Sequence, residues 1–245
     1  MNRIVGIHAV EQALRAGTGR RLLLRKGQLN DRLAMLENLA RELGCPVERI
    51  APDQLPAVGE LADQGVALDV AMPGAGTERE LEALLETAVE PLFLLLDGVT
   101  DPRNLGACLR SAAGFGVTGV ILPKDRSAPI NEAAIKTASG GASLVRTFQV
   151  VNLSRTMEKL KQAGVWIVGT VLEDSQPLQT IDLKGPVAIV LGAEDTGLRQ
   201  NTRKHCDFLA RIPMPLQGLS LNVSVATGIC LYEVSRQRMA HGSVV

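Results

Sequence analysis

Three short segments carry the residues whose types and spacing could do chemistry. Asn104-Leu-Gly-Ala-Cys-Leu-Arg110 places an amide, which could hydrogen-bond a ligand, and a fixed cation on one predicted helix. In Leu191-Gly-Ala-Glu-Asp-Thr-Gly197 two glycines bracket Glu194, so the backbone could approach a ligand closely beside a carboxylate. Ile212-Pro-Met-Pro and Ser220-Leu-Asn222 lead into the last predicted helix, whose free N–H groups could also bind a ligand.

Each segment also has a purely structural interpretation. Asn104 could be the N-cap of its helix with Arg110 solvated, and Ser220 could be the N-cap of the last helix with Asn222 in its first turn. The glycine segment could be an ordinary turn with exposed acids. The chain has neither the Gly-Lys-Ser/Thr ending of a P-loop nor a Gly-x-Gly-x-x-Gly after a predicted strand, so neither phosphate-binding fingerprint is present.

The elements that must position these segments alternate between strands and helices. Near-continuous apolar runs, typical of parallel strands buried on both faces, occur at 91–96, 117–122, 165–171 and 187–191. Helical periodicity predicts helices at 104–115, 130–138, 153–163 and 221–238. This alternation predicts an α/β fold with a parallel sheet and right-handed crossovers. The first two segments follow predicted strands, where such sheets build their binding sites.

In the first part of the chain, the predicted strands and helices are on average shorter than those that follow. Helices are predicted at 7–16 and 33–43, with Gly44 as a C-cap, and strands at 22–24 and 65–70. Small and helix-breaking residues from Met72 to Thr77 suit a linker. We therefore predict a small N-terminal α/β domain over residues 1–72, a linker over 73–89 and a second domain over 90–245.

Composition limits the classes of function. Hydrophobic residues make up 46% of the chain and charged residues 21%, which is enough apolar surface for a real core and argues against disorder. Aromatic residues are only 2%, so stacking of bases on aromatic rings is not expected to be a main mode of recognition. Lys plus Arg and Asp plus Glu number 26 each, and this neutral balance argues mildly against a nucleic-acid partner.

Cysteine and histidine usage argues against a metal site. The four cysteines form no Cys-x-x-Cys pair and the three histidines show no ligand spacing, so we expect reduced thiols, no disulfide framework and no bound metal. The N-terminus lacks the apolar core of a signal peptide, and no run approaches about 18 apolar residues. These features predict a cytoplasmic protein that does not enter a membrane.

Taken together, in this order and spacing, the three segments resemble the three motifs of the SPOUT superfamily of knotted RNA methyltransferases. The branch is that of the TrmH-like 2′-O-ribose methyltransferases, and within it the sequence is most similar to the bacterial enzymes that modify a guanosine of 23S rRNA. The stretch Gly6-Ile-His-Ala-Val-Glu-Gln-Ala-Leu14 resembles the start of that family's small RNA-binding domain. The resemblance spans nearly the whole chain.

The resemblance implies a fold, a cofactor and partners. The second domain is expected to be a SPOUT domain whose C-terminal part threads a loop to make a trefoil knot, with 192–197 and 212–222 as the threaded segments. The family binds S-adenosyl-L-methionine and forms homodimers to which the last helix contributes. The implied reaction is 2′-O-methylation of a guanosine in 23S rRNA, free or in a pre-ribosomal particle. The implied cofactor-binding residues are Thr170, Leu191, Gly192, Ile212, Met214 and Leu221.

The resemblance also assigns catalytic and RNA-binding residues. Arg110 matches the residue proposed to accept the hydroxyl proton, although a guanidinium is always protonated and stabilises a developing alkoxide more readily. The accompanying polar residues are Asn104, Glu194, Ser220 and Asn222. The predicted RNA contacts are Arg20, Arg21, Arg25, Lys26 and Arg103, with a merely solvated surface as the alternative interpretation of this basic cluster.

Three other functions stay open. A tRNA ribose methyltransferase of the same branch would share the catalytic residues, although the extra N-terminal domain favours rRNA. A non-catalytic RNA-binding factor for ribosome assembly could use a degenerate knotted domain, yet all the polar motif residues are intact. An unrelated nucleotide-binding α/β protein is disfavoured by the missing phosphate-binding glycines.

Overall fold

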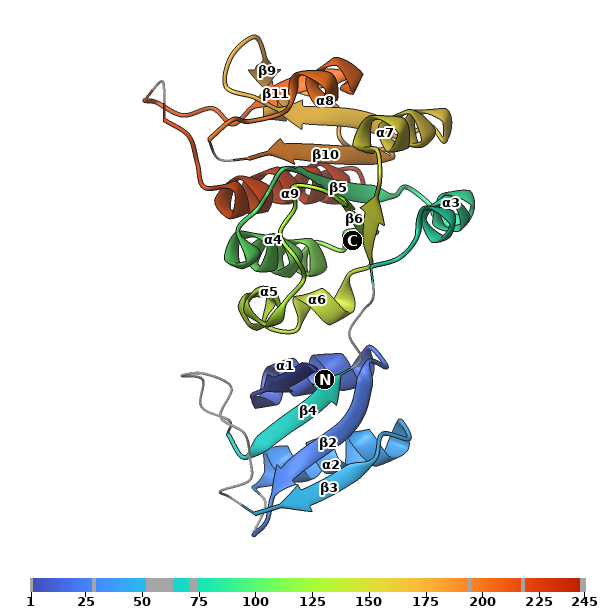
Figure 1. Cartoon of the computed structure of the whole chain (residues 1–245), viewed down its shortest axis with the longest axis vertical. Helices are drawn as coiled ribbons and strands as arrows, with labels where there is room; N and C mark the ends of the chain where they lie inside the picture. The colour runs from blue at the N-terminus through green and yellow to red at the C-terminus, as the bar shows by residue number, and fades with distance from the viewer. Residues whose placement is uncertain are drawn as a thin grey trace. The chain divides into compact units, whose positions relative to one another are not determined.

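The computed structural model describes residues 2–27, 30–51, 64–70, 75–193, 195–216 and 219–242. The chain divides into two compact units (Figure 1): the first comprises residues 1–73 and 142–144, and the second comprises residues 74–141 and 145–245. Across the described ranges, no helix has both the length and the apolar character that crossing a membrane requires.

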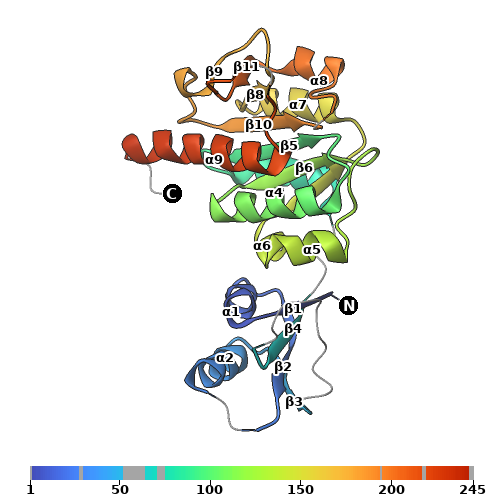
Figure 2. The same cartoon turned by 90° about the vertical axis from the view of Figure 1, so that its left-hand side faces the viewer.

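The first unit is a four-stranded sheet with two helices on one side of it (Figure 2). Its strand order is β1-β4-β2-β3; β4 runs antiparallel to β1 and β2, whereas β3 runs parallel to β2. Apolar side chains of both helices, such as Leu14 and Leu36, are buried with Leu22 and Leu24 of the sheet. The elements are β1 (Asn2–Val5), α1 (Ile7–Arg15), β2 (Gly19–Arg25), α2 (Asp31–Glu42), β3 (Val47–Ile50) and β4 (Val66–Val70).

The second unit is built on a seven-stranded sheet with order β7-β6-β5-β10-β8-β11-β9, in which every neighbouring pair is parallel. This confirms the predicted α/β fold with a parallel sheet. Its elements are α3 (Glu78–Thr87), β5 (Leu92–Asp97), α4 (Pro102–Gly114), β6 (Gly119–Pro123), α5 (Glu132–Ala138), α6 (Gly141–Leu144), β7 (Thr147–Val150), α7 (Leu153–Gln162), β8 (Trp166–Thr170), β9 (Gln176–Pro177), a 3₁₀ turn (Leu178–Thr180), β10 (Val187–Gly192), α8 (Gln200–His205), β11 (Phe208–Arg211) and α9 (Val223–Ala240).

Helices cover both faces of this sheet. On one face, Phe93, Leu95 and Val190 form a buried cluster with Met157 of α7 and Leu81 of α3. On the other face, α4 and α9 lie side by side (Figure 2). Because the central strands are buried on both faces, their sequences are continuous apolar runs rather than alternating ones, which is why the runs predicted β5, β6, β8 and β10.

One structural difference concerns the stretch 73–89, which was expected to be a linker. It contains α3, which starts with a capping box in which Thr77 and Glu80 bond reciprocally. Leu81 of this helix packs into the core of the second unit, so the helix is part of that unit and not only a connection. Leu81 is the buried residue of α3, and most of the other side chains of this helix are polar, so its apolar periodicity is too weak to predict a helix from the sequence.

The trefoil knot expected in the second unit stays a prediction.

Candidate active site

A pocket of about 390 Å³ lies at the carboxyl ends of β8, β10 and β11. This is the edge where parallel α/β sheets build their sites. All six residues predicted to bind a cofactor line it, and so does Ser220; the six are Thr170, Leu191, Gly192, Ile212, Met214 and Leu221. The structure therefore brings the second and third sequence segments together in one wall.

The loop after β10 forms one side of the pocket with its backbone. A Cβ atom on Gly192 would lie 2.1 Å from the Gly197 carbonyl carbon and 2.3 Å from the Leu198 nitrogen, so only glycine fits at this position. The Gly197 N–H donates to the Ala193 carbonyl at 2.8 Å, and Gly197 has a φ of +63°, which favours glycine. The loop thus folds back tightly on the end of β10 and presents main-chain groups to the pocket. Glu194 lies outside the described residues.

Asn104 of the first segment and Asn222 of the third are joined by a hydrogen bond. The Asn222 side-chain N–H donates to Asn104 Oδ1 at 3.1 Å. Asn222 is also the N-cap of α9, because its Oδ1 accepts from the Ser224 N–H at 3.0 Å. Its chain neighbours Leu221 and Val223 line the pocket, so this amide pair lies beside the pocket wall.

Two structural interpretations of these segments were wrong. The N-cap of α4 is Asp101, whose side chain accepts from the Arg103 N–H at 2.8 Å, so Asn104 lies inside the first turn. The N-cap of α9 is Asn222 and not Ser220, which instead lines the pocket. Neither Asn104 nor Ser220 is therefore the N-cap of its helix.

Arg110 lies on α4 with an exposed side chain. Its backbone is fixed by close packing, because a Cβ atom on Gly141 would lie 2.8 Å from Arg110 Cα and one on Gly106 would lie 2.2 Å from the Ala134 carbonyl oxygen. Within the described residues no hydrogen bond or ion pair holds the Arg110 guanidinium, so this structure does not join it to the Asn104–Asn222 pair. The helix backbone is thus rigidly held while the cation stays in solvent.

The pocket also has polar residues that sequence reasoning missed. Glu173, Asp195, Thr196 and Arg203 line it along with the apolar wall. The Arg203 guanidinium lies 3.4 Å from Asp174 Oδ2, which joins α8 to the loop after β8. Glu173 follows the end of β8, and Asp195 and Thr196 follow the end of β10. This position at the carboxyl ends of strands was the signal in the sequence that could have identified these three residues.

Two of the cysteines are buried in a way that keeps their thiols protonated. Burial raises the pKa of the Cys206 and Cys230 thiols to about 12, so neither is a thiolate nucleophile near neutral pH. No group of three or more His, Cys, Asp or Glu side chains in the described ranges could hold a metal ion. Within the described residues, the pocket lining offers main-chain groups, hydroxyls and charged side chains beside its apolar wall.

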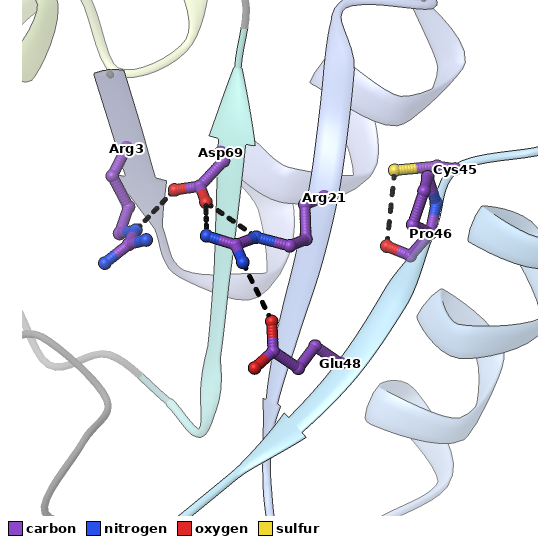
Figure 3. Close-up of polar contacts among 6 residues, drawn as sticks. All are labelled: Arg3, Arg21, Cys45, Pro46, Glu48 and Asp69. Atoms are coloured by element: carbon purple, nitrogen blue, oxygen red, sulfur yellow. Dashed lines mark hydrogen bonds and ion pairs between the residues drawn. The ribbon is translucent and has the colours of Figure 1, made fainter.

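The predicted RNA-binding residues of the first unit fall into two kinds. Arg20, Arg25 and Lys26 are exposed. Arg21 instead forms ion pairs at 2.9 Å with both Asp69 and Glu48 (Figure 3). Arg103, the remaining predicted contact, is exposed in the first turn of α4.

Asp69 holds a second arginine as well. The Arg3 guanidinium donates to Asp69 Oδ1 at 2.5 Å, so the carboxylate lies between two cations (Figure 3). The Asp69 side chain is only 1% exposed. The hydrogen bond from Arg3, and then that from Arg21, hold the pKa of this carboxyl below its usual range.

Comparison with known proteins identifies the family. Residues 91–232 match the SpoU rRNA Methylase family, and residues 3–74 match the family described as RNA 2′-O ribose methyltransferase substrate binding. The chain is 48% identical over 239 residues, which is 96% of each chain, to the 23S rRNA (guanosine-2′-O-)-methyltransferase RlmB of Pseudomonas aeruginosa.

Two solved structures share this architecture over most of their length. The SpoU methyltransferase AviRb from Streptomyces viridochromogenes, in complex with the cofactor AdoMet, is 25% identical with a TM-score of 0.76, covering 97% of this chain and 90% of that chain. An AdoMet-bound rRNA methyltransferase from Sinorhizobium meliloti is 25% identical with a TM-score of 0.73, covering 96% of this chain and 87% of that chain. The family predicted from the three segments is thereby confirmed: this chain belongs to the SpoU rRNA Methylase family.

Proposed function

We propose that this protein transfers a methyl group from S-adenosyl-L-methionine to the ribose 2′-hydroxyl of a guanosine in 23S rRNA. The observation that carries the proposal is the hydrogen bond between Asn104 and Asn222 beside a pocket walled by backbone. The hydrogen bond joins the first segment to the third, and the pocket wall contains residues of the second and third segments. The named relative in Pseudomonas aeruginosa, which matches over 96% of both chains, supports the choice of 23S rRNA guanosine.

The pocket fits the cofactor. Its volume of about 390 Å³ lies in the range of small-molecule sites. Apolar Leu191, Ile212 and Met214 suit an adenine ring, while the Glu173 and Asp195 carboxylates suit an ammonium group. The tight approach of Gly192 to Gly197 leaves main-chain groups to hydrogen-bond the cofactor's polar edges. S-adenosylmethionine supplies an electrophilic methyl group together with its own leaving group, so the proposal requires no metal.

The residues of this chain would then position the hydroxyl and stabilise charge. Arg110, which stays protonated, would stabilise the negative charge that develops on the ribose oxygen. Asn104 and Asn222, already hydrogen-bonded to each other, would orient the ribose or the guanidinium. Ser220 and Glu194 would complete the polar surface, Glu194 by holding Arg110 or balancing its charge. Positioning of this kind can supply much of the rate of a transfer between two bound groups.

We infer that the first unit, over residues 1–72, binds the RNA and that the chain beyond it leads into the catalytic unit. Exposed Arg20, Arg25 and Lys26 would contact phosphates there, and Arg103 would do so beside the pocket. The match of residues 3–74 to the substrate-binding family supports this division. A neutral chain can still bind RNA when its positive charges are segregated on one surface.

We also infer that the protein works as a homodimer. Helix α9 buries one side against the sheet, yet Val225, Ile229, Tyr232 and Met239 are exposed on another. Their spacing of four, three and seven residues aligns them as a second apolar stripe along the helix. An exposed apolar stripe of this length is typical of a protein interface. A second copy of this chain would cover it and would double the basic surface offered to RNA.

The experiment that tests the function follows transfer of labelled methyl from S-adenosylmethionine to unmodified 23S rRNA and, separately, to unmodified tRNA. Alkaline hydrolysis then maps the product, because a 2′-O-methyl group blocks cleavage at its own position. One protected guanosine in 23S rRNA is the expected result, and it should disappear in Arg110→Ala with cofactor binding retained. Label on tRNA and not on 23S rRNA would show that the substrate is tRNA, with the same reaction. Cofactor binding with no label on 23S rRNA would point to a pre-ribosomal particle, and no cofactor binding at all would overturn the proposal.

A further inference from the structure

A buried carboxylate outside the pocket is tied to the loop that shapes it. Asp97 is the last residue of β5, and its side chain is 0% exposed. In the sheet it pairs with Gly192 of β10, the residue from which the pocket loop departs. Asp97 does not line the pocket, and none of the three motif segments contains it. Its partner, Arg199, is the first residue after that loop and its side chain is 39% exposed.

Two contacts join these residues. The Arg199 main-chain N–H donates to Asp97 Oδ2 at 3.1 Å. The Arg199 Nε lies 3.3 Å from Asp97 Oδ1, an oxygen for which the described residues provide no hydrogen bond. The guanidinium charge is therefore what balances this buried oxygen, because a carboxylate without a partner in a protein interior is strongly unfavourable. One carboxylate thus holds both the backbone and the side chain of Arg199.

The turn after β5 is shaped to receive this contact. Gly98 has a φ of +89°, a conformation that L side chains rarely adopt. A Cβ atom on Gly98 would lie 3.6 Å both from Arg199 Nη2 and from Ala193 Cβ. Both ends of the pocket loop, at Ala193 and at Arg199, consequently pack on the turn that follows Asp97. The far end of the loop is fixed at Asp97, and the near end is fixed by β10 itself.

We propose that Asp97 and Arg199 form a clamp that holds the 192–198 loop in its cofactor-binding conformation, which makes both of them positioning residues for methyl transfer. The described residues of that loop all line the pocket. The backbones of Gly192 and Gly197 lie so close together that a Cβ atom on Gly192 would not fit between them. A loop held at both ends keeps its main-chain groups in one arrangement, so the cofactor binds without the cost of ordering them. This inference rests on the proposed function, since it takes the pocket to be the cofactor site.

The test compares Asp97→Asn, Arg199→Gln and the double variant in the full chain. Calorimetry measures the Kd for S-adenosylmethionine, and steady-state assays measure kcat at saturating cofactor. Asp97→Asn has a single side-chain oxygen, so it can keep the hydrogen bond from the Arg199 N–H only by turning its amide NH₂ toward the guanidinium, and we expect Kd to rise about tenfold. Arg199→Gln should act similarly, and the double variant should cost less than the product of the two, because the pair acts as a unit. The change in kcat should be smaller than that in Kd, since neither residue touches the reacting atoms.

The matched control is Asp69→Asn, which removes an equally buried carboxylate bound by arginines, but in the first unit. Its cofactor Kd should equal that of the wild type. If Asp97→Asn does not fold, Arg199→Gln alone decides, because that variant keeps the main-chain hydrogen bond to Asp97. Wild-type Kd in both folded Asp97→Asn and Arg199→Gln, or independent effects in the double variant, would overturn the clamp. A wild-type protein that binds no cofactor would instead overturn the proposed function itself.

Discussion

The two units each bury an aspartate against arginine, and they use it differently. Asp69 on β4 binds two guanidiniums through its two oxygens, those of Arg3 and Arg21, whose side chains are 26% and 42% exposed. Asp97 on β5 binds one guanidinium and the main-chain N–H of the same residue, Arg199. In the first unit a buried charge thus fixes cations at a surface. In the second it fixes the path of a loop.

Glycines show the same difference. Among the described glycines, those whose added Cβ would come within 3.0 Å of another atom all belong to the second unit; they are Gly76, Gly106, Gly119, Gly141, Gly169 and Gly192. In the first unit the tightest values are 3.1 Å at Gly19 and 3.2 Å at Gly65. In the second unit, therefore, several glycines have neighbours too close for a methyl group, and the close neighbour is backbone at Gly106, Gly141 and Gly192. In the first unit the buried Asp69 is held by ion pairs, whose effects are graded, so substitutions in the two units should give different kinds of loss.

Gly192→Ala should give the largest effect. The new Cβ would lie 2.1 Å from the Gly197 carbonyl carbon, and the contact is backbone to backbone, so the loop must move. We expect cofactor affinity to fall by about a hundredfold or more, which is about 2.7 kcal/mol. Calorimetry with S-adenosylmethionine measures it. Gly114→Ala, at the end of α4 where nothing lies within 4 Å of the added Cβ, is the control and should bind normally. Normal binding by Gly192→Ala would show that the loop can shift to accept the methyl group. The close glycine contacts would then not distinguish the second unit from the first.

Ile229→Glu should have the next largest effect. Ile229 is 38% exposed and lies in the stripe of α9, where a charge would be buried if a second copy covers it. Light scattering should show a monomer, and methyl transfer should fall in parallel. Met35→Glu is the control, because Met35 is 70% exposed in the first unit and outside the stripe. A wild-type protein that is monomeric at assay concentrations would contradict the dimer outright.

Among the elements that surround the site, the strands that are buried on both faces of the sheet could be predicted from the sequence. The runs at 91–96 and 187–191 are apolar because both faces of the strands are buried, and they predict the strands that the structure forms at Leu92–Asp97 and Val187–Gly192. Strands β3, β9 and β11 are short or half-exposed, and their sequences lack such a run. Tertiary pairing rather than local pattern makes them strands.

For the site, the sequence predicts which residues take part, and their roles stay predictions, whereas the contacts among them come from the structure. The apolar residues predicted from the resemblance, Leu191, Ile212, Met214 and Leu221, all line the pocket, but so do others that were not predicted, such as Val171 and Leu198. The choice of Asn222 over Ser220 as N-cap could not be made, since both residue types cap helices equally well. The pair of Asp97 and Arg199 left no local signal either, because the two residues are 102 positions apart and meet only once the sheet has formed.

Asp69→Asn tests the electrostatic side of the comparison through pH. The pKa of Asp69 is lowered by Arg3 and then by Arg21, so the charged form stabilises the fold above the unfolded pKa of about 3.9, and this stability is lost as the pH falls through the lower folded value. At pH 7 the variant should lose about 1–3 kcal/mol in the first unit. The difference between wild type and variant should shrink below about pH 4.

Hydrogen exchange of peptides from β2 and β4 measures this opening free energy locally. Trp166 and Tyr232 both belong to the second unit, so fluorescence would report the wrong unit. Exchange in β5 and β10 should be unchanged and serves as the internal control. A wild-type-to-variant difference that persists at pH 2 would mean that shape rather than charge holds Asp69 in place.

The smallest effect separates two adjacent arginines. Arg20 is exposed and forms no ion pair among the described residues, whereas Arg21 is committed to Asp69 and Glu48. If Arg20 contacts a phosphate, Arg20→Ala should lower the slope of log affinity against log salt by about 0.7–0.9, one released counterion. Arg21→Ala should leave that slope near the wild-type value and instead weaken hydrogen-exchange protection in β2 and β4. Filter binding of 23S rRNA fragments across salt concentrations measures the slopes. Equal losses of slope would place Arg21 on the RNA as well, and the ion pairs of Asp69 would then be a resting arrangement that RNA displaces rather than a fixed part of the fold.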